Sequence, residues 1–375
     1  MSCLKRDLII ITLIFLFAIG IINIINNNKK IKIVLFNENT RILEKNIEQF
    51  ERENNVEVEI EKMDFYSVLS KMEEKKIFSE KLPDVFMAAN DWMGEIVNEG
   101  IAEKVKQKDL EDIIPSIREG VRVNKNYYAY PYRLETMFLF YNKNYILNIP
   151  KNISELLYLK QKIENETEKY GVIFPTDEIY YHYPWYKYLG GGVNGIATLD
   201  KKDIVMKNEI DFIGRNFQYM NRNSVIKKYN NEESLMMING SWEIEKVMNN
   251  KFQTEYGMIK DENFKPFIGF KSFVVYKKSK NKKAAEKLVK FLIDKERQRK
   301  FSKDKWHISP NKTVFYSGIN KASKELAWCI ENPEIMPSNL LIRNNCNTAG
   351  ELLSRVVKNK EDVEKSILEL FGGRK

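Results

Sequence analysis

Aromatic and imidazole rings are concentrated in one short segment of the sequence, directly after two acidic residues. Six of the eight positions from Ile179 to Tyr186 carry such rings, and Asp177 and Glu178 precede them. Sugar rings present apolar C–H faces that stack on aromatic rings, while their hydroxyl groups need polar partners such as carboxylates. The segment therefore indicates a carbohydrate-binding surface. The alternative is that its rings fill the hydrophobic core, where aromatic side chains usually lie.

Two other kinds of chemistry could use the same residues. Glu135 with Asp177 or Glu178 would supply a carboxylate pair for glycan hydrolysis. The run Tyr180-Tyr181-His182 with Glu178 would suit a transport protein for ferric ion, and a carrier of another small solute is a further alternative. Because acidic pairs are frequent in this sequence, we expect a binding protein and no enzyme, with no catalytic residue, metal ligand or cofactor. Turnover of a labelled oligosaccharide would reveal an enzyme, and a tyrosinate-to-iron absorption band would reveal a metal carrier.

The composition and the charge exclude several classes of protein. The chain has 375 residues, 43% of them hydrophobic and 12% aromatic, which allows sizeable cores and is unlike a disordered protein. Three cysteines and two distant histidines are too few for a disulfide scaffold or a four-cysteine zinc site. The net charge of +9 arises from interleaved basic and acidic residues, whereas nucleic-acid binders concentrate basic residues in a stripe or module. We therefore predict no nucleic-acid partner.

The first 30 residues carry the pattern of an export signal. The 18 residues from Leu8 to Ile25 are uncharged, and Lys5-Arg6 precede them. A basic stretch before an apolar run is typical of exported proteins, and a run of this length can just span a bilayer. Because the apolar run continues beyond its possible cleavage site, retention is favoured over release. We predict that residues 1–30 are a signal peptide or N-terminal membrane anchor, and that the protein is tethered on the periplasmic or extracellular face.

The body of the chain after residue 30 alternates between predicted strands and helices. β-branched runs and strict alternation predict strands, whereas apolar residues at three- and four-residue intervals predict helices. A strand–helix–strand–helix–strand order implies a parallel sheet with right-handed crossovers. The first predicted strands lie at residues 31–36, 56–60 and 82–87, with helices at 42–50 and 66–78. Later extended segments lie at 128–132, 137–141 and 268–276, helices at 153–170, 209–221 and 282–301, and a mainly helical region from 321 onward.

The carboxyl ends of the first and third strands carry three candidate ligand contacts. In open sheets of this kind, ligands bind beyond the carboxyl ends of the strands. Glu38 follows the first strand, and Asp91 and Trp92 follow the third. Two alternatives remain, because Glu38 could stand in a solvated loop and Asp91 could cap a helix.

Four segments resemble, in the correct order, the extracellular solute-binding proteins of ABC transporters. The likeness is closest to the sugar- and maltodextrin-binding branch of that family, and it covers essentially everything after residue 30. Each segment is weakly specific alone, but four in the family's order are more specific. The segments are residues 83–92 with 100–103, Tyr130-Pro131 with Glu135 and Tyr141-Asn142-Lys143, residues 237–242, and residues 267–272 with Ile308-Ser309-Pro310.

The resemblance implies a fold and a function. The fold is an α/β, two-lobed periplasmic-binding-protein-like fold, with a hinge that closes the lobes around a ligand in a central cleft. The function is that of an extracytoplasmic substrate-binding component of an ABC importer, a monomer that delivers a sugar or oligosaccharide to permease subunits in the membrane. The implied lobes are residues 31–133 with 270–312, and 138–265 with 316–375.

The resemblance also assigns roles to single residues. Asp91 matches the family's sugar-binding acid, while Trp92 stands where the family often has a polar residue. Trp242 matches a stacking platform, with core packing as its alternative. Glu135 lies in the crossover among apolar residues, so it would need a partner if buried, and an ion pair with Arg133 is the alternative to ligand contact.

The resemblance implies two further ligand contacts, and the sequence differs from the maltodextrin branch at one point. Glu178 and Tyr180 match the family's aromatic cleft patch before a Gly-Gly turn. The maltodextrin branch has a tryptophan after a Met-Pro turn near the C-terminus, but no aromatic residue follows Met336-Pro337 closely in this chain. This argues against maltodextrin itself and leaves sugar binding open. The predicted ligand-binding residues are Glu38, Asp91, Trp92, Glu135, Glu178, Tyr180 and Trp242.

Overall fold

The computed structural model describes residues 29–36, 40–64, 67, 83–197, 203–304, 306–338 and 340–372. Their contacts divide the chain into two compact units. The first unit ends at Met87 and also includes Val275–Leu292, and the second comprises Ala88–Val274 and the chain from Ile293 onward. These units are groups of contacting residues, and the lobe boundaries given above stay a prediction.

Three expectations fall on residues that the structure does not describe. They are the apolar segment from Leu8 to Ile25, most of the helix predicted at 66–78, and the candidate contact Glu38. In the described ranges, no helix combines the length and the apolar character needed to cross a bilayer.

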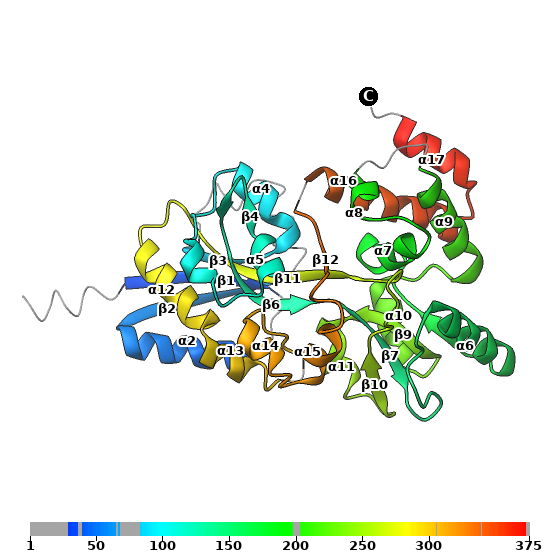
Figure 1. The fold of residues 1–375 in the computed structure, drawn as a ribbon, viewed down its shortest axis with the longest axis horizontal. Coiled ribbons are helices and arrows are strands. Elements are labelled where there is room, and N and C mark those ends of the chain that lie inside the picture. The colour runs from blue at the N-terminus through cyan, green and yellow to red at the C-terminus, as the bar shows by residue number, and fades with distance from the viewer. Residues whose placement is uncertain are drawn as a thin grey trace, which may run out of the picture. The chain divides into compact units, whose positions relative to one another are not determined.

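Parallel strands form the first unit, as the strand–helix–strand order predicts (Figure 1). β1 pairs with β2 along its whole length, and its centre pairs with β3. Both pairings are parallel, which confirms the predicted parallel sheet. The elements of this unit are β1 (Lys29–Phe36), α2 (Thr40–Asn54), β2 (Val56–Met63), β3 (Val85–Ala89, which continues into the second unit) and α12 (Lys282–Ile293).

The helices of the first unit bury the faces that their sequence patterns predict. Leu43, Ile47 and Phe50 on α2 are almost fully buried, in agreement with their helical spacing. The Phe50 ring meets the ring of Phe291 on α12 edge to face, with centroids 5.4 Å apart. Asn55 then adopts a left-handed backbone with a φ of 49°, which ends α2 just before β2.

The Pro83-Asp84 pair before β3 has a structural role. The Asp84 carboxylate accepts hydrogen bonds from the Lys32 backbone N–H at 2.9 Å and from the Ser279 hydroxyl at 2.5 Å. The side-chain amide of Asn281 lies 3.4 Å from the same carboxylate. One acidic side chain therefore joins β1 to the segment that leads into α12. In the structure this Pro-Asp motif therefore ties two segments of the first unit together.

Strands of the second unit form two arrangements. β11 pairs antiparallel with β6 and parallel with β12, and a separate sheet has the order β10-β7-β9-β8. A short hairpin, β4–β5, turns through two residues with positive φ, as hairpin turns require. The bounds are β4 (Arg122–Val123), β5 (Asn126–Tyr127), β6 (Tyr130–Glu135), β7 (Met137–Asn142), β8 (Tyr170–Ile173), β9 (Ser234–Gly240), β10 (Thr254–Gly257), β11 (Phe267–Val275) and β12 (Glu334–Ile335).

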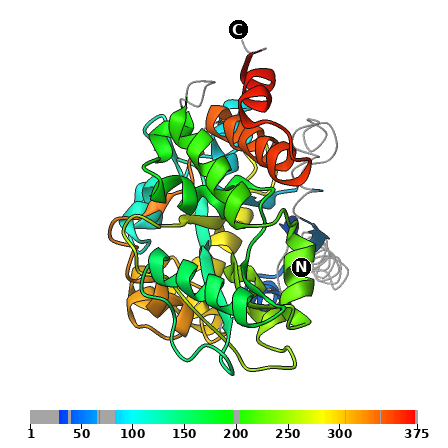
Figure 2. The same ribbon diagram turned by 90° about the vertical axis from the view of Figure 1, so that its right-hand side faces the viewer.

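Helices flank the four-stranded sheet of the second unit. α6 contacts β8, and α10 contacts β9. The C-terminal helices α16 and α17, orange and red in Figure 2, pack against the green helices α7, α8 and α9. The bounds are α4 (Met93–Asn98), α5 (Pro115–Glu119), α6 (Ile153–Glu166), α7 (Ile179–Tyr188), α8 (Val193–Ala197), α9 (Ile204–Asn216), α10 (Arg222–Asn230), α11 (Ile244–Val247), α13 (Lys295–Phe301), α14 (Lys312–Tyr316), α15 (Lys321–Leu326), α16 (Leu340–Leu353) and α17 (Val363–Gly372).

Capping side chains explain two differences from the predicted helices. Residues 282–301 form two helices and not one, because Asp294 accepts two backbone hydrogen bonds and starts α13. The helix predicted at 209–221 lies five residues earlier, since Asp203 caps the first turn of α9. The helical C-terminal region predicted from residue 321 is confirmed by α15, α16 and α17.

A buried pair of titratable groups joins α7 to α9 in the core. His182 Nδ1 lies 2.7 Å from Glu209 Oε1, and both side chains are 0% exposed. Their second polar atoms, His182 Nε2 and Glu209 Oε2, have no hydrogen-bond partner in the described part of the chain. Burial raises the pKa of the Glu209 carboxyl, His182 opposes that shift, and Asp203 adds to it. His182 is therefore a core histidine and not part of a ligand surface.

We expect Glu209→Gln to change how stability depends on pH. The folded protein holds the Glu209 proton to a higher pH than the unfolded chain does, so the wild-type free energy of unfolding falls as the pH rises through this window. Glutamine has the same shape and cannot ionise, so the variant should gain stability relative to wild type as the pH rises above 4.5, the ordinary pKa of a glutamate carboxyl. Urea unfolding at several pH values measures both curves.

Glu233→Gln provides the control for this experiment. Glu233 is exposed, and its hydrogen bond to Lys228 lowers the pKa of the carboxyl, so it is already ionised across the window tested. Its replacement should shift the curve without changing the slope. Parallel curves for wild type and Glu209→Gln would contradict the assignment of the raised pKa to the buried pair.

Candidate functional site

The turn after β3 holds two of the predicted contacts. Asp91 and Trp92 lie in the 3-10 turn η2 (Asn90–Trp92), and Asp91 is partly buried. Ala89 precedes this turn and Trp92 precedes α4, so Asp91 does not take the capping position that was its alternative role. Trp92 is 0% exposed. The structure therefore places Trp92 in the core and not at a surface that a ligand reaches.

Asn90, the first residue of the same turn, fixes two other segments. Its side-chain amide donates to the Met336 carbonyl oxygen at 2.5 Å, and its side-chain oxygen accepts from the Phe270 backbone N–H at 3.0 Å. The side chain is buried, so both groups would otherwise lack water as a partner. Asn90 thus joins the turn to β11 and to the residue after β12. No sequence pattern indicated this role.

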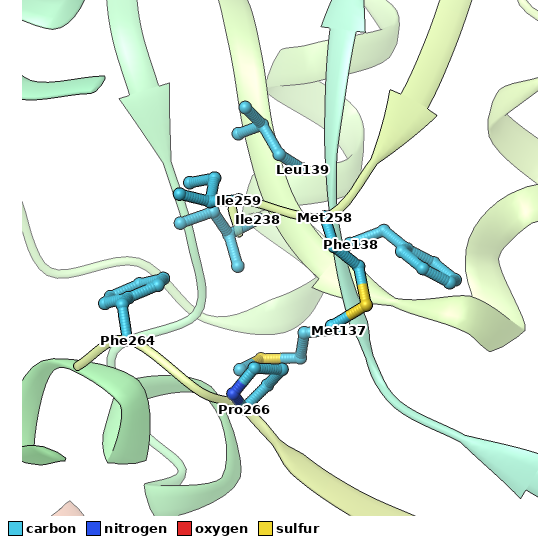
Figure 3. Close-up of a pocket in the computed structure, with 8 residues that line it drawn as sticks. All are labelled: Met137, Phe138, Leu139, Ile238, Met258, Ile259, Phe264 and Pro266. Carbon is cyan, nitrogen blue, oxygen red and sulfur yellow. The ribbon is translucent and has the colours of Figure 1, made fainter. Parts of the chain in front are cut away.

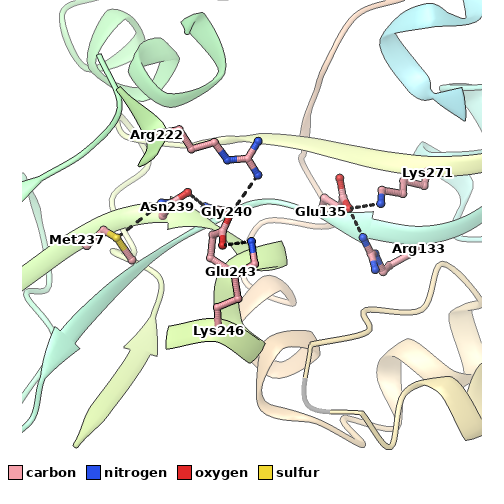
Figure 4. A network of polar contacts seen from close by, with 9 residues as sticks. All are labelled: Arg133, Glu135, Arg222, Met237, Asn239, Gly240, Glu243, Lys246 and Lys271. Atoms are coloured by element: carbon pink, nitrogen blue, oxygen red, sulfur yellow. Dashed lines mark hydrogen bonds and ion pairs between the residues drawn. The ribbon is translucent and has the colours of Figure 1, made fainter. Parts of the chain in front are cut away.

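A cluster of charged residues surrounds Glu135 at the end of β6. Arg133 and Glu135 lie two residues apart on one strand and so point to the same face, and Lys271 on β11 pairs directly with Arg133. Arg133 Nη2 lies 2.5 Å and Lys271 Nζ 3.7 Å from Glu135 Oε1 (Figure 4). Both cations are almost fully buried, whereas Glu135 is 16% exposed. The ion pair with Arg133, which was the alternative to ligand contact, is present, and the Glu135 carboxylate keeps some access to solvent.

The charges of this cluster keep Glu135 ionised. Burial alone would raise the pKa of the Glu135 carboxyl, but Lys271 and Arg133 outweigh burial, and Arg222 adds to their effect, so the pKa is lowered. The Arg133 guanidinium also lies over the ring of Trp306, 4.6 Å from its centroid. A carboxylate fixed in this way can accept hydrogen bonds from a ligand at neutral pH. It is an unsuitable general acid.

Most rings of the aromatic segment pack in the core. Tyr181, Tyr183, Trp185 and Tyr186 on α7 are at most 1% exposed and join the hydrophobic core of the second unit. Tyr183 stacks on Phe267 with centroids 3.6 Å apart. The prediction that the whole segment forms a ligand surface is therefore wrong for these four rings. Every residue from Tyr181 to Tyr186 is buried, so this part of α7 is enclosed by the core on all sides and presents no face to a ligand.

Tyr180 and Trp242 are the two predicted aromatic contacts that remain partly exposed. Their rings lie 5.6 Å apart at an angle of 49°. The Tyr180 hydroxyl donates weakly to the carbonyl oxygens of Glu135 and Phe267, at 3.3 and 3.4 Å. Tyr180 therefore stands between Glu135 on β6 and Trp242 after β9, and it brings three of the predicted contacts together.

The charge environment keeps the Tyr180 hydroxyl neutral. Burial raises its pKa well above the ordinary value, and the carboxylates of Glu135 and Asp91 raise it further. Tyr180 is a hydrogen-bond donor here and is poorly suited to act as a tyrosinate ligand.

Gly240 supports the indole of Trp242 directly. A methyl group on Gly240 would lie 2.2 Å from the indole atoms Cε2 and Cζ2, so any larger residue would displace the ring. Gly240 is also the last residue of β9, and its backbone N–H bonds to the Asn239 side chain at 2.8 Å. Glycine in the Asn239-Gly240 pair is therefore required because the Trp242 ring leaves no room for a side chain.

Arg222, a residue that sequence reasoning missed, faces the same indole. Its guanidinium carbon lies 5.2 Å from the Trp242 ring centroid, and Nη2 donates to Glu243 Oε1 at 3.1 Å. Glu178, the remaining predicted contact, is partly buried at the start of α7, where its carboxylate acts on Arg222 electrostatically. Glu135, Tyr180 and Trp242 are thus linked by direct contacts, whereas Asp91 and Glu178 act on Tyr180 and Arg222 through their charges.

A small apolar cavity between β7, β9 and the segment before β11 is no candidate for the site (Figure 3). Its volume is about 20 Å³, enough for one water molecule and far too small for a sugar. Only apolar side chains and a proline face it, so a water molecule would find few partners. It is lined by Met137, Phe138, Leu139, Ile238, Met258, Ile259, Phe264 and Pro266.

In the part of the chain that the structure describes, no group of three or more His, Cys, Asp or Glu side chains is arranged to hold a metal ion. The arrangement instead combines two partly exposed rings, an ionised carboxylate and a held guanidinium. These groups can stack on apolar faces and exchange hydrogen bonds with hydroxyl groups.

Comparisons with known proteins agree on one family. The profile of the family described as bacterial extracellular solute-binding protein matches residues 45–327. The maltotriose-binding protein of Pyrococcus abyssi is 28% identical over 234 residues, which cover 56% of this chain and 50% of that protein. A maltooligosaccharide ABC transporter solute-binding lipoprotein of Streptococcus pneumoniae is 24% identical over 348 residues, which cover 84% and 81%. The chain thus spans about half the length of the first of these relatives.

A solved structure establishes the fold. The maltotriose-binding protein of Thermus thermophilus, solved with maltotriose bound, matches with a TM-score of 0.78 at 19% sequence identity. The match covers 91% of this chain and 98% of the other. It confirms the predicted fold class, an α/β fold of the two-lobed periplasmic-binding-protein type.

Proposed function

The chain belongs to the family of bacterial extracellular solute-binding proteins, and we propose that it is the substrate-binding component of an ABC importer for a sugar or oligosaccharide. The observation that carries this proposal is the arrangement of Tyr180 and Trp242 beside the ionised Glu135. Partly exposed rings offer stacking surfaces, and the carboxylate offers acceptors for hydroxyl groups. The names of the relatives from Pyrococcus and Streptococcus support a carbohydrate ligand.

The ligand class follows from what the site offers and what it lacks. The raised pKa of Tyr180 disfavours the tyrosinate that a ferric site would use, which supports sugar over iron. The maltodextrin branch has a further tryptophan near a Met-Pro turn. In the corresponding Met336-Pro337 turn of this chain, the Met336 carbonyl oxygen accepts a hydrogen bond from the Asn90 side chain. We therefore propose a sugar or short oligosaccharide and leave its identity to experiment.

The proposal extends to partners and location. The ligand would be handed to permease subunits in the membrane, and the protein would act as a monomer that binds without turnover. Residues 1–30 would tether it on the outer face of the cytoplasmic membrane, as a signal peptide that is retained or as an anchor. The family is one of extracellular proteins, and the Streptococcus relative is named a lipoprotein, which supports an exported and tethered protein.

A thermal-shift screen tests the proposed ligand class. The panel contains maltotriose, a neutral galactotriose, a peptide mixture, polyamines and ferric ion. A ligand that binds only the folded state stabilises it by about 2.7 kcal/mol when present at 100 times its Kd. We expect a neutral sugar to raise the melting temperature. Stabilisation by ferric ion alone, with a visible absorption band, would contradict the sugar proposal.

We expect Trp242→Ala to weaken sugar binding more than it weakens folding. The indole is a partly exposed ring, and truncation of such an aromatic anchor costs about 2–4 kcal/mol of binding, or roughly 30- to 1,000-fold in affinity. The loss of folding stability should stay below the roughly 3–5 kcal/mol typical of a fully buried tryptophan. Calorimetric titration and urea unfolding of one variant measure the two quantities.

Trp328→Ala provides the matched control. Trp328 is also partly buried beneath a cation, with Lys265 Nζ 5.5 Å from its ring centroid, and it belongs to no part of the site. Its removal should leave sugar affinity unchanged. A Trp242→Ala variant that binds as tightly as wild type but loses much of its stability would place Trp242 in the core and remove it from the site.

A further inference from the structure

Arg222 is held in place by a buried carboxylate and an aromatic ring. It is the first residue of α10, and its guanidinium lies over the indole of Trp242, 5.2 Å from the ring centroid. Glu243, which is 1% exposed, accepts from Arg222 at 3.1 Å and from Lys246 Nζ at 3.0 Å on its other oxygen (Figure 4). A buried carboxylate bound on both oxygens cannot swing away from its partner. The guanidinium is therefore preorganised.

In the described residues, the N–H donors of Arg222 and Trp242 outnumber the acceptors that bind them. A guanidinium has five N–H donors, and in the described residues Arg222 uses one of them on Glu243. The indole N–H of Trp242 is buried and finds no acceptor in the same part of the chain. Because the Arg222 side chain is 25% exposed, its remaining donors can reach a ligand.

The surrounding charges decide which acceptor a ligand should bring. Burial would lower the pKa of the Arg222 guanidinium, but Tyr181, Glu243 and Glu178 outweigh burial and raise it, and Arg222 in turn helps to lower the pKa of Glu135. Figure 4 shows Arg222 bound to Glu243, and Glu135 bound separately to Arg133 and Lys271. Glu243 already pairs with this guanidinium, so a ligand needs to bring no negative charge of its own to balance it. Neutral oxygen acceptors are therefore sufficient.

We propose that Arg222 is a specificity-determining ligand contact that binds two adjacent hydroxyl oxygens of a neutral sugar ring, and that Glu243 is the residue that positions it. Parallel N–H groups of a guanidinium match a pair of neighbouring oxygens, which lysine cannot reproduce. The indole beneath supports the guanidinium through a cation–π contact and so helps to fix its plane. This inference rests on the proposed function and names the ligand class more narrowly.

Affinity measurements on the full chain test the contact and its positioning. Calorimetric titration with maltotriose and with a neutral galactotriose is carried out on wild type, Arg222→Lys, Glu243→Gln and the double variant. We expect Arg222→Lys to weaken binding about tenfold or more, because the charge remains and the paired donors are lost. Glu243→Gln should also weaken binding. In the double variant the loss should equal that of Arg222→Lys alone, because Glu243 acts through Arg222.

The chain contains a similar arrangement that serves as the control. Arg122 is bonded to Glu119 at 2.8 Å and lies 5.9 Å from the Tyr127 ring centroid, away from the site. Arg122→Lys and Glu119→Gln should leave affinity within about twofold of wild type, since an exposed ion pair contributes little. Circular dichroism melts of all variants separate unfolding from loss of contact.

Each outcome bears on a separate statement. Arg222→Lys that binds within about twofold of wild type overturns the ligand contact, and additive losses in the double variant overturn the positioning role of Glu243. A wild-type protein that binds a galacturonic acid trisaccharide as tightly as its neutral counterpart overturns the preference for neutral sugars, and this arm needs no variant. Wild type that binds no sugar at all contradicts the proposed function, and the present proposal falls with it.

Discussion

The side-chain amide of Asn90 fixes the strand on which the candidate site is assembled. It binds the Phe270 backbone N–H and the Met336 carbonyl oxygen at once, so the turn after β3, strand β11 and the end of β12 are held by one buried group. The neighbouring residue of β11, Gly269, pairs with Glu135 and leaves room for the Tyr180 ring above it. The positions of the Glu135 carboxylate and the Tyr180 hydroxyl therefore follow from where β11 is held.

The charges of the site follow a second constraint, the cost of burying ions. Arg133 and Lys271 are almost fully buried, and both approach Glu135, while Glu243 is buried and bound by Arg222 and Lys246. Buried charges persist in proteins only when they are paired and hydrogen-bonded. The result is a set of ionised groups that stay fixed before a ligand arrives, so little of the binding energy is lost in ordering them.

The sequence predicted the fold more fully than the site, for physical reasons. Strand alternation and helical spacing are local properties, so β1, α2, β2 and β11 could be located from the chain alone. The burial of Tyr183 and Trp92 depends on partners distant in the chain, such as Phe267 for Tyr183, and it could not be read from their types. Arg222 carried no motif, and the segment 267–272 assigned no role to Lys271, since the roles of both residues arise when β6, β11 and the start of α10 meet in space. A chain-wide family likeness located Trp242 and Glu135, but it gave no information about which charges would surround them.

Gly240 has a consequence for anyone who wishes to alter the ligand preference by laboratory evolution. The residue has no side chain, yet a single added carbon would collide with the indole of Trp242 at 2.2 Å. Position 240 therefore controls where this indole lies and, with it, the shape of the proposed site. In a randomised library that includes this codon, most variants would have a displaced Trp242 ring. A library that keeps glycine at position 240 can vary the surrounding polar residues while the ring stays in place.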